Sequence, residues 1–169
     1  PSVDDSKVAD YPEMASKEIR DYVLEQMKTG RYDTIITNIP PPDMLTHMGV
    51  NPATIKGIEA TDRAAGPIMQ QALDQKGSAV IISDHGSADR VIEVIDGIEY
   101  DDVAHTDRDV PFMIRTEEPQ RLKGLKLKGE GRLVDFAPTI LMLLGVDSAD
   151  MPSDWDGKSL LVPSETEGV

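Results

Sequence analysis

The sequence predicts an α/β protein with a mostly parallel sheet flanked by helices. Segments with helical apolar spacing alternate along the chain with short apolar runs of strand length. Residues that favour caps and turns stand at the ends of several of these segments. Because strands separated by helices form parallel sheets with helices on their faces, this order indicates a layered fold.

Three segments carry the apolar spacing and the end signals of helices. They cover residues 16–29, 51 to about 75, and 134–146. Within the second, Gly66 and Pro67 are expected to kink the helix or divide it. The expected N-caps are Ser16, Asn51 and Asp135, and the expected stops are Gly30, Gly77 and Gly145.

Short apolar runs predict the strands. The expected core strands are 33–39, 78–83 and 110–115. Residues 40–44, "PPPDM", are expected to form a rigid loop, since proline cannot continue a central strand. Segments 89–95 and 98–102 flank Asp96-Gly97, which is a strong signal for a β-hairpin.

Composition restricts the classes of partner and the compartment. The chain has 31 acidic and 17 basic residues among 169, a net charge of −14, which argues against nucleic acids and membranes as partners. No apolar run approaches the roughly 20 residues of a membrane span, and no signal-peptide pattern opens the chain. The absence of cysteine favours a reducing cytoplasm. We expect one domain portion over residues 1–162 and a loose tail over 163–169.

All three histidines follow or precede predicted strands, and two have an aspartate close by. His47 lies four residues after Asp43, His85 directly follows Asp84, and His105 lies shortly before the third core strand. Ligands of open α/β sheets gather outside the carboxyl ends of the strands. These five side chains are therefore the candidate metal ligands.

The chemistry of these side chains points to a transition metal. Imidazole with carboxylate suits Mn²⁺, Zn²⁺ or Fe²⁺, and two metals about 3.5–4 Å apart commonly clamp a phosphoryl group. Asp43 and His47 could share one ion, while Asp84 and His85 could reach another or bridge. Aspartate and glycine are also common turn residues. From the residues alone, these side chains could instead be hydrogen-bonded structural groups that bind no metal.

Several stretches carry a family resemblance. In chain order they are "YPEMASKEI", "PPPDMLTHMG", "VIISDHGSADR", "VAHTDRDVPFM" and "GRLVDFAPTILMLLGV". Together they resemble the C-terminal part of the cofactor-independent phosphoglycerate mutases, a family of the alkaline phosphatase superfamily. The likeness extends over nearly the whole chain with similar spacings. It implies an alkaline phosphatase-like fold, of which this chain would be part of one domain.

The resemblance also implies a site and a reaction. Asp43, His47 and His105 would hold one ion, and Asp84 with His85 would supply half of the ligands of a second. The two ions are usually manganese, with Zn²⁺ or Fe²⁺ as alternatives. Such enzymes interconvert 3-phosphoglycerate and 2-phosphoglycerate in glycolysis through a phosphoserine.

The same resemblance implies that this chain contains no catalytic nucleophile. The family's nucleophilic serine, a further aspartate ligand and the glycerate-binding basic residues belong to a more N-terminal part, which would be the partner of this piece. We therefore expect the chain to be inactive alone.

Some positions depart from the family pattern. Ser87 stands for asparagine, Asp89 for glutamate, Asp102 for histidine and Thr46 for glycine, although every metal ligand is retained. Two other functions stay open: a different alkaline phosphatase superfamily phosphomutase or phosphatase, and a non-catalytic metal-binding domain.

Overall fold

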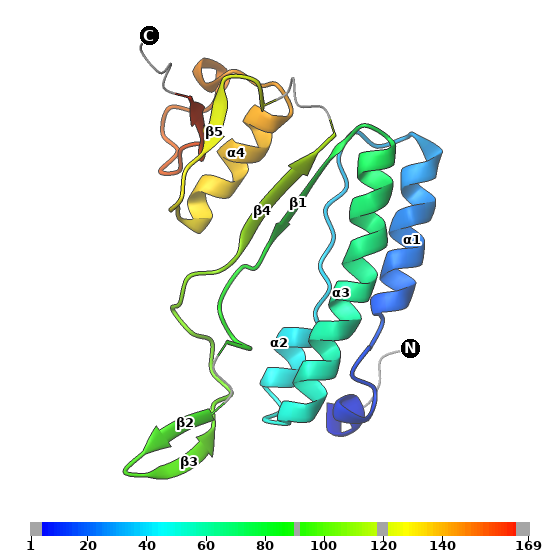
Figure 1. Ribbon diagram of the computed structural model, residues 1–169, viewed down its shortest axis with the longest axis vertical. Helices are drawn as coiled ribbons and strands as arrows, with labels where there is room; N and C mark the ends of the chain where they lie inside the picture. The colour runs from blue at the N-terminus through cyan, green and yellow to red at the C-terminus, as the bar shows by residue number, and fades with distance from the viewer. Residues whose placement is uncertain (1–4, 90–91, 118–121, 165–169) are drawn as a thin grey trace. The chain divides into compact units, whose positions relative to one another are not determined.

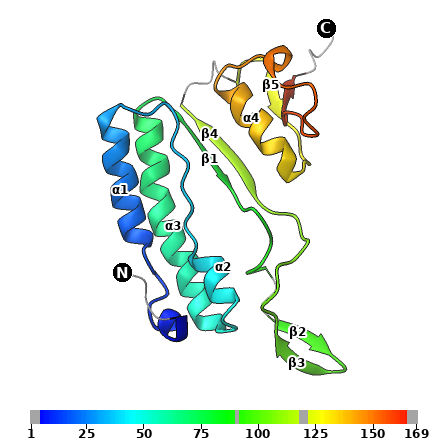
Figure 2. The ribbon, with the colours of Figure 1, turned by 180° about the vertical axis from the view of Figure 1, so that it is seen from behind.

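The computed structural model describes residues 5–89, 92–117 and 122–164, which form two compact units (Figures 1 and 2). Unit 1 comprises Pro1–Thr116 and unit 2 comprises Glu117–Val169. Within the described ranges, no helix has the length and apolar character needed to cross a bilayer. Of the predicted loose tail, Pro163 ends a strand and the Ser164 N–H donates to Gly124 O, while residues 165–169 lie outside the described residues.

Unit 1 contains helices followed by strands. Its elements in order are η1 (Asp5–Asp10), α1 (Ser16–Thr29), α2 (Pro41–Thr46), α3 (Asn51–Asp74), β1 (Ser78–Ile82), β2 (Ile92–Ile95), β3 (Ile98–Asp101) and β4 (Phe112–Thr116). Figure 1 shows α1 and α3 side by side, with the extended segment between α1 and α2 running back along them.

The two long helices confirm the sequence prediction. Gly30 closes α1 in a left-handed conformation with φ 62°, a geometry that glycine adopts without strain. Helix α3 continues through Pro67 and is not divided there. The N-caps lie one residue earlier than predicted, at Ala15 and Val50, and neither side chain caps its helix. Assignments of helix ends commonly differ by this much.

The prediction of a rigid loop over 40–44 was wrong, because α2 begins at Pro41. Proline is tolerated in the first turn of a helix, where its missing N–H would have no partner in any case. Leu45 of α2 is fully buried, and a Cβ on Gly57 of α3 would overlap it. Close approach of α3 thus fixes the position of α2.

The predicted strand at 33–39 was also wrong. Among the described residues it forms no ladder, and Ile36 is 83% exposed. The β-favouring side chains keep the segment extended, but a strand exists only where a neighbour pairs with its backbone. No such neighbour lies within the described residues.

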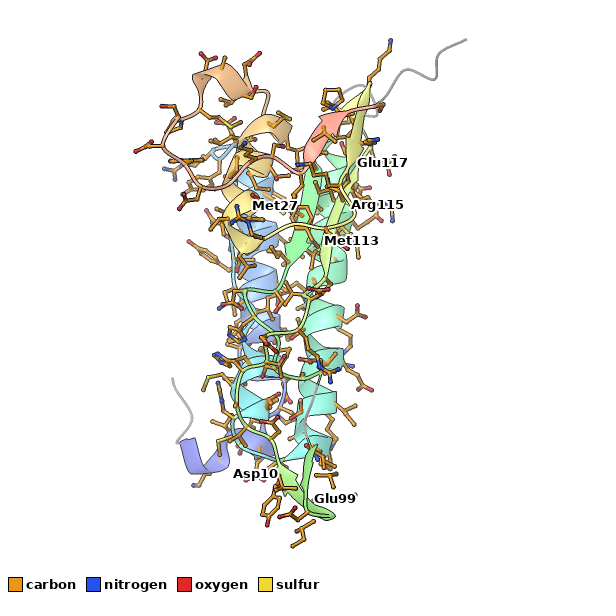
Figure 3. All side chains as sticks on the ribbon, turned by 90° about the vertical axis from the view of Figure 1, so that its left-hand side faces the viewer. Asp10, Met27, Glu99, Met113, Arg115 and Glu117 are labelled. Atoms are coloured by element: carbon orange, nitrogen blue, oxygen red, sulfur yellow. The ribbon has the colours of Figure 1, made fainter. Side chains whose placement is uncertain are left out.

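The α/β class is confirmed, but the expected parallel pairing does not occur among the described strands. β1 pairs with β4 in antiparallel register, with Ile81 opposite Met113. No helix is described between β1 and β4, so the chain turns back without the crossover that a parallel pair needs. Met113 and Arg115 lie two residues apart on one exposed face of β4 (Figure 3).

The predicted hairpin is confirmed. β2 and β3 are antiparallel and joined by Asp96 and Gly97, both at positive φ. These dihedrals suit the two-residue turns that match strand twist. The hairpin extends from the loops that follow β1 and precede β4 (Figure 1).

Unit 2 is built around a short helix. Its elements are β5 (Leu125–Leu127), η3 (Leu133–Asp135), α4 (Phe136–Leu143), η4 (Ser148–Asp150) and β6 (Leu161–Pro163), with β5 and β6 antiparallel. The helix predicted over 134–146 is therefore shorter, with a 3₁₀ turn before it and Gly145 beyond its end at φ 89°.

The predicted capping role of Asp135 was wrong in its detail. Asp135 occupies the N-cap position of α4, yet its side chain bonds to no N–H of that helix. Its Oδ2 accepts from the Arg132 N–H and its Oδ1 from the Lys158 N–H, both at 2.8 Å. The carboxylate ties the segment before β6 to the start of α4.

Candidate metal centre

Helix α2 and its C-cap residue His47 carry two of the predicted ligands. Asp43 and His47 are four residues apart, a spacing that brings side chains together across one helical turn. Asp43 Oδ1 lies 3.3 Å from His47 Nε2. Leu45 and Thr46, between them in sequence, are buried and anchor the helix.

Two loops bring the remaining histidines to the same oxygen. His85 follows the end of β1, and His105 lies in the loop between β3 and β4. Their Nε2 atoms lie 3.8 Å and 3.2 Å from Asp43 Oδ1, respectively. Residues from three separate segments of unit 1 thus converge on one carboxylate oxygen.

The three histidine rings also lie close to one another. His85 stacks on His105 with centroids 3.6 Å apart and 17° between the planes. His105 Nε2 also lies 3.0 Å from His47 Nε2. Imidazole nitrogens gathered in this way are common metal ligands.

One hydrogen bond selects the tautomer of His47. Its Nδ1 lies 2.7 Å from the carbonyl oxygen of Val103. A carbonyl can only accept, so Nδ1 donates to it, and in the neutral ring Nε2 then carries the lone pair. Nε2 is on the side of Asp43 and His105. The backbone therefore fixes the orientation of the His47 ring.

Two polar atoms of the cluster have no hydrogen-bond partner among the described residues. They are Asp43 Oδ1 and His85 Nδ1, and both are buried. The three Nε2 atoms near Asp43 Oδ1 are close but not aligned as donors. A buried carboxylate oxygen without a donor is costly unless a cation compensates it.

The distances within the cluster fit a bound divalent ion. Ligand atoms about 2.0–2.2 Å from one metal lie roughly 3.0–3.5 Å from each other in tetrahedral or octahedral arrangements. The separations of 3.0 to 3.8 Å among Asp43, His47, His85 and His105 are close to this range. Asp43, His85 and His105 each offer a ligand atom, and these three atoms lie within 4.8 Å of one another.

Asp84 differs from the other four predicted ligands. Its side chain is 85% exposed, and its Oδ1 lies 3.6 Å from His85 Nε2. The group formed by Asp43, His85 and His105 also combines residues that were predicted to bind two different ions. The division between two ions stays a prediction.

Sequence reasoning missed the contacts made by the ligand candidates and by the loops that carry them. The Val103 carbonyl is a backbone atom, and no side-chain pattern marks it. The Thr106 hydroxyl donates to both carboxylate oxygens of Asp89, at 2.9 and 3.1 Å. In the sequence, only the position of Thr106 next to His105 could have indicated that Thr106 contributes to the site.

This α/β fold gathers one carboxylate and three imidazoles, a donor set typical of metal-binding proteins. The chain belongs to the metalloenzyme superfamily, whose family model matches residues 2–148.

Several similar proteins are phosphoglycerate mutases. The 2,3-bisphosphoglycerate-independent phosphoglycerate mutases of Staphylococcus haemolyticus and Staphylococcus aureus are each 40% identical over 162 residues. That of Staphylococcus epidermidis is 38% identical over the same length. Each match covers 94% of this chain and 30% of the relative, so the chain spans about a third of these proteins. The predicted family resemblance is confirmed.

A solved structure supports the fold. Leishmania mexicana phosphoglycerate mutase, crystallised at low cobalt concentration, matches 94% of this chain and 30% of its own, with a TM-score of 0.82 and 24% identity. This likeness confirms the fold class that the sequence predicted.

Proposed function

We propose that this chain carries the metal-binding part of a phosphoglycerate mutase that interconverts 3-phosphoglycerate and 2-phosphoglycerate. The observation that carries the proposal is the convergence of three imidazole Nε2 atoms on Asp43 Oδ1, within 3.2 to 3.8 Å. The 40% identity to named mutases supports the choice of substrate.

Within this proposal, Asp43, His47 and His105 hold one divalent ion, and Asp84 with His85 supplies ligands to a second. Bound ions of this kind lower the pKa of a coordinated hydroxyl and stabilise charge on a transferring phosphoryl group. The chain's own residues orient the imidazoles. His47 is oriented through the Val103 carbonyl.

The proposed reaction needs groups beyond those identified in this chain. A phosphoserine mechanism requires a nucleophilic serine activated by a metal or base, and basic residues to hold the glycerate carboxylate. Among the described serines, Ser83 donates its hydroxyl to the His85 carbonyl and is engaged there. We therefore expect no turnover by the 169-residue chain alone.

Manganese is the metal we propose, with Zn²⁺ or Fe²⁺ as alternatives of similar ligand preference. The Leishmania mexicana enzyme was crystallised with cobalt, another divalent transition metal of the same preference. The cysteine-free composition supports a reducing, cytoplasmic setting consistent with glycolysis.

A metal titration followed by thermal unfolding tests the proposal. Binding to the native state stabilises it by RT ln(1 + [L]/Kd), about 2.7 kcal/mol at a hundredfold excess of Mn²⁺ over Kd. We expect this stabilisation in the wild-type chain and its loss in His47→Ala. Met48→Ala is the matched control, since it alters the adjacent exposed residue.

Two results would contradict the proposal. Equal Mn²⁺ stabilisation of wild type and His47→Ala would exclude His47 as a ligand. Conversion of 3-phosphoglycerate by the pure chain would exclude the expected dependence on a separate nucleophile. Hydrolysis of simple phosphate esters without mutase activity by a longer protein containing this chain would instead favour a phosphatase.

A further inference from the structure

Two loops that carry metal-ligand candidates are joined directly to each other. Gly86, which follows His85, forms an isolated antiparallel bridge with Thr106, which follows His105. The Thr106 N–H donates to the Gly86 carbonyl at 2.8 Å. The backbone contact therefore lies one residue beyond each histidine.

A side-chain contact reinforces this bridge. The Thr106 hydroxyl lies between both oxygens of Asp89, at 2.9 and 3.1 Å. Arg108 Nε lies 3.4 Å from Asp89 Oδ2 and faces the same carboxylate. Asp89 is 35% exposed, so the ion pair is screened by solvent and the hydroxyl contact is the more directional of the two.

Steric contact leaves little freedom in this junction. A Cβ on Gly86 would overlap Thr106 Oγ1 and would lie 3.0 Å from Asp89 Oδ1. Only glycine permits the loops to approach this closely. The close approach sets the spacing of residues 85 and 105, whose rings stack at 3.6 Å.

We propose that Asp89 and Thr106 form a bracket, the Asp89–Thr106 bracket, that holds His85 stacked on His105 so that both Nε2 atoms face Asp43. Both are positioning residues, because they act on the ligands through the loop that each belongs to. The proposal rests on the proposed function in one respect, that the cluster binds a metal ion. The stacking of the rings is independent of that function.

The Thr106 variants separate the hydroxyl from the shape of the side chain. Thr106→Val keeps the branched volume and removes the donor, whereas Thr106→Ser keeps the donor. Loss of a group that orients metal ligands typically weakens metal affinity about 10- to 100-fold. We expect Thr106→Val to weaken Co²⁺ binding about 10-fold, and Thr106→Ser to stay near wild type.

Two readouts distinguish orientation from general stability. The visible absorption of bound Co²⁺ reports the geometry of its ligands, and Thr106→Val should change the band as well as the affinity. The chain has only three histidines, so the NMR spectrum of the metal-free chain contains histidine ring C–H signals from three residues. Loss of the stack should move the His85 and His105 ring signals in Thr106→Val and leave them in place in Thr106→Ser.

A double variant tests whether the hydroxyl acts through the carboxylate. Asp89→Leu removes both acceptor oxygens and keeps a branched side chain of similar size. If the bracket is correct, Thr106→Val should have little further effect on Co²⁺ affinity in the Asp89→Leu background. Two effects that simply add would overturn the coupling that we propose.

The outcomes separate this proposal from the proposed function. Absence of Co²⁺ and Mn²⁺ binding in wild type would reject the function, and the ring signals of the metal-free chain would still decide the bracket. Unchanged ring signals in a folded Thr106→Val chain would overturn the bracket, as would equal losses in Thr106→Val and Thr106→Ser. Changed signals only in Thr106→Val would support it.

Discussion

Asp135 in unit 2 is a buried carboxylate, whereas the Asp43 side chain in unit 1 is 35% exposed and has one buried oxygen. Asp135 is 8% exposed, and each of its oxygens accepts a backbone N–H at 2.8 Å. Asp43 Oδ1 is buried with no hydrogen-bond partner among the described residues, although three imidazole nitrogens lie within 3.8 Å. One carboxylate is satisfied by its own unit, and the other is not.

The difference separates a structural group from a ligand-binding group. Backbone donors that satisfy a buried carboxylate stabilise the fold directly. Asp43 Oδ1 has three imidazole nitrogens beside it but accepts no hydrogen bond from the described residues, an arrangement that a bound cation would stabilise. Replacing Asp135 should therefore reduce stability alone, while replacing Asp43 should reduce metal binding alone.

The largest expected effect is on metal binding by Asp43→Asn. The substitution removes the carboxylate on which the three histidine Nε2 atoms converge, so Mn²⁺ affinity should fall about 100-fold or more. Because the buried Asp43 Oδ1 accepts no hydrogen bond from the described residues that the amide would lose, stability without metal should change by less than about 0.5 kcal/mol. Calorimetric titration and metal-free thermal unfolding measure the two quantities.

Asp62→Asn is the charge-matched control, since Asp62 is exposed on α3. It should leave Mn²⁺ affinity unchanged at moderate ionic strength. If Asp43→Asn unfolded the metal-free chain, Asp43 would be a structural group like Asp135. The proposed distinction between the two carboxylates would then be wrong.

A smaller effect, on stability, is expected for Asp135→Ala. Two hydrogen bonds to a charged acceptor are lost and two N–H groups must find water, so unit 2 should lose about 3 kcal/mol. Urea unfolding followed by fluorescence of Trp155 measures this loss, because the only tryptophan of the chain lies in unit 2. Mn²⁺ affinity, a property of unit 1, should not change.

Asp154→Ala is the control for this measurement. It alters an exposed aspartate beside Trp155 and should change stability by less than about 0.5 kcal/mol. Similar losses in both variants would mean that Asp135 contributes no more than an ordinary surface charge.

Elements with local signals were predictable from the sequence, and elements that depend on distant partners were not. α1, α3 and the β2–β3 hairpin follow from apolar spacing, glycine stops and the Asp96-Gly97 turn. Segment 33–39 has the composition of a strand, but a ladder also requires a neighbouring strand. The residues of the segment cannot show whether such a neighbour is present.

The same distinction applies to the candidate site. The convergence of Asp43, His47, His85 and His105 was foreseeable, because each stands close to an end of a predicted element. The Asp89–Thr106 bracket and the Lys158 partner of Asp135 were not, because they join residues 17 and 23 positions apart without a periodic pattern. Geometry, rather than residue type, selects these contacts.

The smallest expected effect is the pH dependence of unit 2 stability. The Lys158 N–H holds the pKa of Asp135 below its usual value of 3.8, against the opposing effect of burial, and the Arg132 N–H lowers it further. A carboxyl whose pKa is lower in the folded state stabilises fully above its unfolded pKa, and this contribution is lost as pH falls through the folded pKa. The stability difference between wild type and Asp135→Asn should therefore be constant above about pH 5 and shrink below it. Urea midpoints from Trp155 fluorescence between about pH 6 and pH 3 measure that difference. A difference that did not shrink in acid would show that Asp135 acts through its shape and not its charge, and the contrast with Asp43 would then concern geometry alone.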